Sequence, residues 1–181
     1  MQLLAPLTAT LLVLTPIATA DFSLYKVGRG GTGLAGNIEG WQVYANTPDT
    51  IRCKSVRERL NWGQMPDVSG KKSGVRCKKE KGKCARSDGG GEILELELNE
   101  PRMEGGRYHF TLCGGADALS ACLVAYYKDR GGALVGLKGE NLGHCTPDEG
   151  AQFWCSKGIS RVQGTRKLNC KSPIWARDLD N

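Results

Sequence analysis

The residues best suited to acid–base chemistry in this sequence are its two histidines, His109 and His144. His109 lies in the segment YHFTL, close to Arg107, and Glu95 and Glu97 lie upstream in EILELELN. A histidine or glutamate base, a histidine acid and an arginine that binds phosphate are the groups that a secreted ribonuclease needs. One hypothesis is therefore a secreted hydrolase, most concretely a ribonuclease using His109, His144 and Glu95. The same residues are equally expected on the solvent face of a strand, so their types alone do not establish an active site.

Other catalytic signatures are missing from the sequence. There is no G-x-S-x-G elbow and no H-E-x-x-H pair, which removes the common serine hydrolase and zinc protease patterns. The segment GTGLAG, with Gly31, Gly33 and Gly36, fits G-x-G-x-x-G, but IEGWQVYANTP after it is not a crossover helix. The glycines of Gly28–Gly36 therefore predict a flexible turn. No cofactor and no metal site are expected, and a binding role is favoured over catalysis.

Positive charge is concentrated between Lys71 and Arg86. This segment holds eight basic residues and one acid, Glu80, a net charge of +7, whereas the whole chain carries +6. A loop tied at Cys77 and Cys84 and charged in this way attracts polyanions such as phospholipid head groups, acidic wall polysaccharide or nucleic acid. A lysine run without interleaved aromatic residues is also typical of a solvated loop. The lysines expected to bind are Lys78, Lys79, Lys81 and Lys83.

The eight cysteines further restrict the possible functions, because they can form disulfides or bind a metal. An even number in an exported chain predicts four disulfides, although eight cysteines allow 105 pairings and spacing does not choose among them. Zinc ligands usually lie two to four residues apart, whereas six residues separate Cys77 from Cys84, the closest pair. His144 and Cys145 are adjacent and point to opposite sides if that segment is extended. Disulfides are thus favoured over metal ligation. The cysteines are Cys53, Cys77, Cys84, Cys113, Cys122, Cys145, Cys155 and Cys170.

The N-terminal segment explains why an oxidising compartment is expected. Met1–Ala20 has no charged side chain, contains the apolar run Leu7–Leu14 and ends in Ala-Thr-Ala, which is typical of a secretory signal peptide cleaved after Ala20. The remaining Asp21–Asn181 suits a single disulfide-stabilised domain. No later segment is apolar enough to span a membrane. We therefore expect a secreted, extracellular monomer.

Short alternating segments between glycine-rich turns predict the architecture. The clearest is Glu92–Asn99, in which Leu94, Leu96 and Leu98 alternate with glutamates and are expected on one buried face. Many such segments favour a β-rich sandwich or barrel, and Asp49–Leu60 is the best helix candidate. An α+β fold with that helix on an antiparallel sheet is the alternative. The other predicted strands are Phe22–Val27, Trp41–Ala45, Val75–Cys77, Tyr108–Leu112, Leu123–Tyr127, Ala133–Leu137, Gln152–Cys155, Ser160–Gln163 and Arg166–Cys170.

The aromatic residues suggest a further alternative, a carbohydrate-binding module. Trp41, Trp62, Trp154 and Trp175, with Tyr126 and Tyr127, offer flat faces on which sugars stack. Tryptophans in predicted strands are as readily explained by core packing. Core packing is therefore expected for all of the tryptophans except Trp175, which follows the last cysteine.

Six segments resemble small secreted cysteine-rich proteins of filamentous fungi. The resemblance implies export and a disulfide-stapled, strand-rich fold, and such proteins are usually discussed as candidate effectors or elicitors that act on a host. It implies no active-site residue. The expected function is therefore binding of a host surface, immune or cell-wall component, or of an anionic polymer or lipid, in the context of virulence. The segments are DFSLY (Asp21–Tyr25), GWQVY (Gly40–Tyr44), DVSG with GVRC (Asp67–Gly70, Gly74–Cys77), YYKDRG (Tyr126–Gly131) and RKLNC (Arg166–Cys170).

Overall fold

The computed structural model describes residues 20–31, 38–45, 51–70, 72–82, 84, 92–100, 122–136, 139–148 and 150–172. These residues form a ten-stranded sheet with one short α-helix and one 3-10 turn. The elements are β1 (Ala20–Gly31), β2 (Ile38–Tyr44), α1 (Cys53–Glu58), β3 (Trp62–Gly63), β4 (Gly74–Lys79), β5 (Ile93–Glu100), β6 (Cys122–Tyr127), η2 (Lys128–Arg130), β7 (Ala133–Gly136), β8 (Asn141–Pro147), β9 (Gln152–Lys157) and β10 (Ser160–Ser172).

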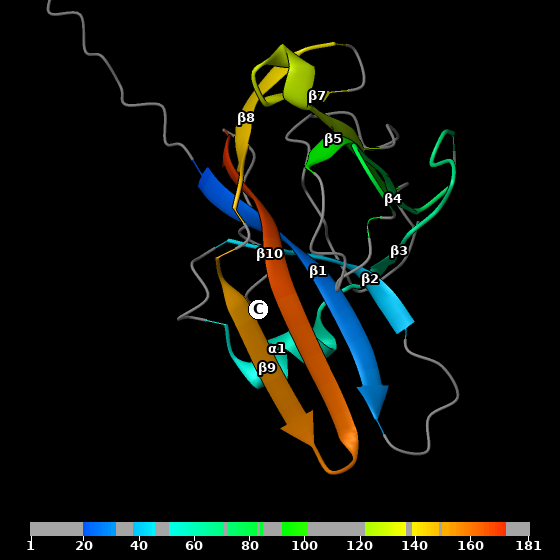
Figure 1. The fold of residues 1–181 in the computed structure, drawn as a ribbon, viewed down its shortest axis with the longest axis vertical. Coiled ribbons are helices and arrows are strands. Elements are labelled where there is room, and N and C mark those ends of the chain that lie inside the picture. The colour runs from blue at the N-terminus through cyan, green and yellow to red at the C-terminus, as the bar shows by residue number, and fades with distance from the viewer. Residues whose placement is uncertain are drawn as a thin grey trace, which may run out of the picture.

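The sheet curls into a nearly closed barrel (Figure 1). Nine strands follow the order β3-β2-β1-β10-β8-β7-β6-β5-β4, and all of the ladders between them are antiparallel. The two ends of this path meet at a parallel bridge between Gln64 and Val75, where the Met65 N–H donates to the Val75 carbonyl at 2.9 Å. The predicted β-rich fold with at most one short helix is confirmed.

The barrel encloses the larger of two apolar cores. Alternate residues of the wall strands point inward, as a period of two requires, except at a bulge in β5. The buried residues include Leu24, Val43, Leu96, Tyr126 and Leu168, and two tryptophans close one end. Those tryptophans, Trp41 and Trp62, are 1% and 2% exposed, so their predicted core packing is confirmed.

Strands β1, β2 and β10 are longer than the barrel and continue past it as a four-stranded extension with β9. β10 pairs with β8 through its C-terminal half and with β9 through its N-terminal half, so it belongs to both parts (Figure 1). One face of the extension is covered by α1 and holds the second core, which includes Tyr25, Val27, Phe153 and Val162. Phe153 packs directly over Gly164, where a Cβ would lie 2.3 Å from the ring.

Buried polar contacts fasten the segment of α1 to β2. The Gln42 amide donates to the Val56 carbonyl at 3.1 Å and accepts from the Tyr44 hydroxyl at 2.6 Å. The Arg59 guanidinium donates to the Val43 carbonyl at 2.6 Å and stacks over the Tyr44 ring at 4.3 Å. These bonds leave α1 little freedom to move off this face, so the opposite face of the extension is the one turned toward solvent.

Disulfides reinforce both parts. Within the described residues, Cys77 is bonded to Cys84, Cys145 to Cys170, and Cys53 to Cys155. Cys145–Cys170 joins β8 to β10 and Cys77–Cys84 ties the loop after β4 to that strand, whereas Cys53–Cys155 joins α1 to β9. Cys113 lies outside the described residues. No helix in the described part of the chain is long and apolar enough to cross a membrane.

Several sequence expectations need correction. The helix covers only Cys53–Glu58 and not Asp49–Leu60, because its apolar stripe is narrow and only Val56 is buried. The expected turn at Gly28–Gly36 is wrong at its start, since β1 runs to Gly31 and pairs with both neighbours. Two predicted strands, Ser160–Gln163 and Arg166–Cys170, are one strand, β10. Strands β3 and β8 were not predicted, and Tyr108–Leu112 lies outside the described residues.

One leucine of β5 does not lie on the buried face where the alternating pattern predicted it. A bulge opposite Lys78 and Lys79 places Ile93 in register with Lys79 and leaves Leu94 as the extra residue. As a result Ile93, Leu96 and Leu98 are buried, whereas Leu94 is only half-buried. The glutamates between them remain on the outer wall, as predicted.

Candidate functional site

The proposed acid–base residues share the outer wall of the barrel but are not brought together. Glu95 on β5 pairs with Tyr127, Tyr127 with Ala133, and Ala133 with His144 on β8. Three strand spacings therefore separate Glu95 from His144, about 14 Å. This distance is too large for the two side chains to exchange protons with one reacting group. His109 lies outside the described residues.

Glu95 has structural partners on the neighbouring strand. Its carboxylate accepts from the Lys78 ammonium at 3.2 Å and from the Arg76 guanidinium at 3.0 Å. The hydrogen bonds from Lys78 and then Arg76 hold the pKa of Glu95 below its usual value. Arg76 also binds Glu97 through two bonds of 2.6 and 2.7 Å. A carboxylate held ionised in this way is suited to stabilising the β4–β5 hairpin, and its pKa moves away from that of a general acid at neutral pH.

The basic loop is fixed at its base, as expected, by the Cys77–Cys84 disulfide. Its charges are partly used within the protein, because Lys78 is paired with Glu95 and Lys79 is half-buried. Lys81 is exposed, and Lys83 lies outside the described residues. The loop therefore presents fewer free charges than the sequence count of +7 suggests.

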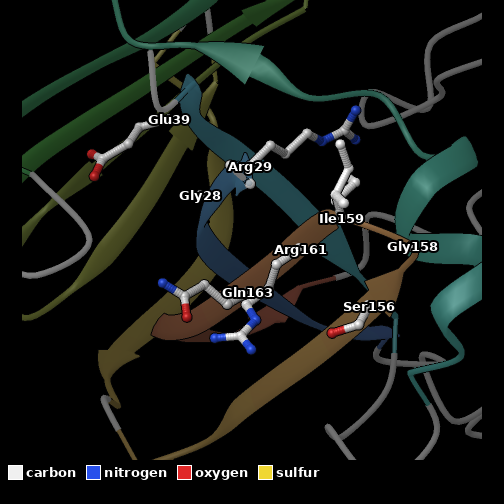
Figure 2. A pocket seen from close by; sticks show the side chains of 11 residues that line it. Gly28, Arg29, Glu39, Ser156, Gly158, Ile159, Arg161 and Gln163 are labelled. Carbon is white, nitrogen blue, oxygen red and sulfur yellow. The ribbon is translucent and has the colours of Figure 1, made fainter. Parts of the chain in front are cut away.

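A second candidate site, which the sequence did not single out, is a groove on the open face of the extension. It has a volume of ≈ 630 Å³, within the usual range of ligand pockets. Figure 2 shows Arg161 and Gln163 extending to the same side of β10, whereas Arg29 extends to the other side. The lining residues are drawn from β1 (Gly28, Arg29, Gly30, Gly31), β2 (Glu39), and β9, β10 and the turn between them (Ser156, Gly158, Ile159, Ser160, Arg161, Gln163).

Strand pairing explains why these side chains meet. Gly28 lies opposite Glu39 on one side and Gln163 on the other, and Gly30 lies opposite Arg161. Residues directly opposite in a ladder share a face, and two glycines without side chains leave the middle of that face hollow. The groove is thus a glycine floor with polar walls.

The groove lies at the mouth of the barrel, because its face is the continuation of the barrel's inner surface. Two residues further into the barrel along each strand, and so on the same face, Lys26 lies opposite Trp41. Lys26 is 1% exposed, and its ammonium lies 2.6 Å from the Gln64 amide oxygen, 3.9 Å from the Glu39 carboxylate and 5.0 Å from the centroid of the Trp41 ring. This cluster closes the barrel below the groove. Barrel mouths are common positions for ligand sites.

The buried cluster also sets the charge at the groove. Burial lowers the pKa of Lys26 to about 8, against the attraction of Glu39, and the nearby charge of Lys167 lowers it further. Lys26 thus remains largely protonated at neutral pH and neutralises Glu39. The rim then carries one acid, Glu39, and one exposed base, Arg161.

An exposed tryptophan borders the groove. Trp154 on β9 lies opposite Gln163, and the Arg161 guanidinium lies 5.9 Å from the centroid of its ring. Trp154 is 59% exposed, so the expectation that it packs in a core is wrong. The sequence did contain the signal: Phe153 and Cys155 flank it, and both are buried. In a strand, the residue between two inward-facing neighbours must point outward.

Comparison with known protein families, characterised proteins and solved structures gives no significant match. The function of this protein must therefore be inferred from its own geometry and chemistry.

Proposed function

We propose that the protein is an exported, non-catalytic binding protein of the effector or elicitor type, which recognises a host or cell-wall component at the groove. The observation that carries this proposal is the groove itself: ≈ 630 Å³ of open space at the mouth of the barrel, with a glycine floor and polar walls. Mixed apolar and polar lining on rigid strands is typical of ligand sites.

Export is supported by the disulfides. Three are formed among the described residues, and such bonds persist mainly in oxidising compartments. Two of the three contribute directly to rigid presentation of a binding surface, because Cys53–Cys155 holds β9 and Cys77–Cys84 closes the basic loop. A surface fixed in this way loses little conformational entropy when it binds.

The basic loop is a second contact for an anionic component. Lys81 is exposed, and the Lys78 side chain is 57% exposed although it pairs with Glu95. A charge of this kind acts over about a Debye length and weakens with salt. Its contribution to binding is therefore separable from that of the groove.

A ribonuclease has less support. Of its proposed residues, Glu95 is occupied by Lys78 and Arg76, and His144 is exposed three strands away. The two hypotheses differ in an immediate outcome: RNA hydrolysis that is lost in both His109→Ala and His144→Ala would favour the enzyme.

The proposal is tested by retention of the purified protein on insoluble plant and fungal wall fractions and on vesicles of phosphatidylcholine with phosphatidylserine. We expect retention on at least one of these materials. The variant Lys78→Gln/Lys79→Gln/Lys81→Gln/Lys83→Gln should lose only the salt-sensitive part of it. Absence of retention on every material would overturn the proposal, and hydrolysis of RNA would then favour the enzyme.

A further inference from the structure

The exposed aromatic residue at the groove narrows the class of ligand. Trp154 is one of few large apolar side chains exposed among the described residues, and it stands on an edge strand with only β10 as a neighbour. An indole ring offers a flat apolar surface with little side-chain entropy to lose. Such a ring is suited to a ligand with a flat apolar face.

The polar groups that line the groove require a ligand that both donates and accepts hydrogen bonds. Arg161 supplies only donors, Glu39 only acceptors, and Ser156 a hydroxyl that does both. They come from three strands, β10, β2 and β9, and line the groove together with the glycines. A sugar ring combines the features required here, since it has a face of C–H groups and a rim of hydroxyls.

Charge at the rim distinguishes a neutral ligand from a polyanion. The two charges at the rim are each engaged within the protein, Glu39 with the Lys26 ammonium at 3.9 Å and Arg161 with the Trp154 ring at 5.9 Å, so they offer a phosphate or uronate chain no row of free positive charge. Grooves that bind single-stranded nucleic acid are instead positively charged along the backbone path. A neutral polyol satisfies both groups without repulsion.

The length of the groove points to a chain and not to a single sugar. It extends along β10 from Gln163, opposite Trp154, to Ile159 at the tip of the hairpin. Four residues of extended strand cover about 13 Å, which is longer than one sugar ring. Ile159 is exposed and offers a second apolar contact at the far end.

We infer that the groove binds a neutral polysaccharide chain, with one sugar ring stacked on Trp154 and hydrogen-bonded by Arg161 and Ser156, and with Glu39, across the glycine floor, accepting from the hydroxyl of another sugar in the chain. This inference rests on the proposed binding function and specifies both its site and its ligand class. It assigns the basic loop no part in recognising the sugar.

Isothermal titration with soluble hexasaccharides of chitin, cellulose, β-1,3-glucan and xylan tests the inference. Wild-type protein should bind at least one of them. Trp154→Ala should weaken that binding about tenfold or more, given the usual contribution of stacking on an aromatic ring, and Trp154→Phe should restore part of it. Because Trp154 is exposed, neither variant should lose thermal stability.

The chain offers a matched control in Tyr127 on the outer wall. It too carries a stacked arginine, with the Arg130 guanidinium 4.5 Å from its ring centroid, but lies far from the groove. Tyr127→Ala should leave glycan binding unchanged. A second variant, Gly30→Val, tests the groove floor. It places a β-branched side chain on that floor, in a strand conformation that valine favours, and should abolish binding.

The outcomes separate this inference from the proposed function. Binding of a hexasaccharide that is equal in wild type and Trp154→Ala, or lost equally in Tyr127→Ala, overturns the site. A different result is that the protein binds no hexasaccharide and yet is held, in a salt-sensitive way, by wall material, vesicles or RNA. In that case the inferred ligand class is wrong and the proposed binding function stands. Retention of nothing overturns both.

Discussion

The outer wall of the barrel and the open face of the extension use charged and aromatic side chains in opposite ways. On the wall, Arg76 is bonded to Glu97 and Glu95, Glu95 to Lys78, and Tyr127 is covered by Arg130. On the extension, Trp154 is exposed beside Arg161, above a floor of glycines. The charged and aromatic side chains of the wall contact one another, whereas the extension has a hollow beside its exposed tryptophan. The extension therefore offers a ligand more open surface than the wall does.

The difference shows why charge counted along the sequence is a poor guide to the binding surface. The lysines around Cys77 dominate the sequence count, but Lys78 faces the glutamates of the adjacent strand once β4 and β5 pair. Ion pairs that are partly exposed contribute little to stability individually, although a network contributes more. Changes on the wall should therefore alter stability, and changes at the groove should alter binding.

The largest expected effect comes from the disulfide that holds the extension. Cys53–Cys155 closes a loop with a sequence separation of 102, and Cys77–Cys84 one with a separation of 7. In the chain-entropy description, a loop of a hundred residues contributes about 4.7 kcal/mol, and a loop of this shorter kind about 2.5 kcal/mol. Cys53→Ser/Cys155→Ser should therefore lower the free energy of unfolding in denaturant by about 4 kcal/mol, and Cys77→Ser/Cys84→Ser by about 2 kcal/mol.

The same pair of variants separates the two regions in function. Cys155 is adjacent to Trp154 on β9, so loss of its disulfide should also weaken retention of ligand at temperatures where the variant is still folded. Loss of Cys77–Cys84 should leave retention at the groove intact. Equal loss of binding in both double variants would mean that the two regions do not act separately.

The next effect concerns Lys26, which lies between the barrel and the groove. Burial lowers its pKa from 10.5 to about 8 in the folded protein. Between these values the unfolded chain binds more protons than the folded chain, so stability should rise with pH from about 8 to about 10. The full gain is about 3 kcal/mol, as 1.36 kcal/mol per pKa unit implies. Above pH 10 the buried hydroxyls of Tyr44 and Tyr126, whose pKa values burial raises, should reverse the trend.

Lys26→Met isolates this contribution. It replaces a buried charge with an apolar side chain of similar length, so the variant should be at least as stable as wild type at pH 7. Its free energy of unfolding should stay flat between pH 8 and pH 10, while the decline above pH 10 remains. A variant with the wild-type slope would show that Lys26 is not the group responsible for it.

Local patterns predicted much of this fold because each depends on one strand. Alternation placed Tyr25 and Leu24 on opposite faces of β1, and both are buried because β1 has a core on each side. The pairing of β1 with β10 was not predictable, since the partners lie at opposite ends of the chain and no local pattern specifies register between them. The same holds for the bridge from Gln64 to Val75 that brings the barrel's ends together.

The groove was missed for the same reason. Gly28 and Gly30 were interpreted as turn residues because glycine is favoured in loops. Only the pairing of β1 with β2 and β10 shows that they form the floor of the groove. Trp154 was within reach of local reasoning, because a strand residue between Phe153 and Cys155 points to the opposite side from both. The residue types in the sequence show which chemical groups are available. Which of these groups lie side by side follows only from the pairing of strands in the sheet.

The smallest expected effect is on the wall and tests whether its charges serve the fold alone. Arg76 and Glu97 form a two-bond pair of 2.6 and 2.7 Å, with side chains 29% and 21% exposed. In a double-mutant cycle, Arg76→Gln, Glu97→Gln and the combined variant should give a coupling of about 1 kcal/mol in the free energy of unfolding. All three variants should be retained on wall material as strongly as the wild type, because the groove lies on the extension and not on the outer wall of the barrel. Loss of retention in Arg76→Gln without loss of stability would instead move the binding surface to the outer wall, where the basic loop begins.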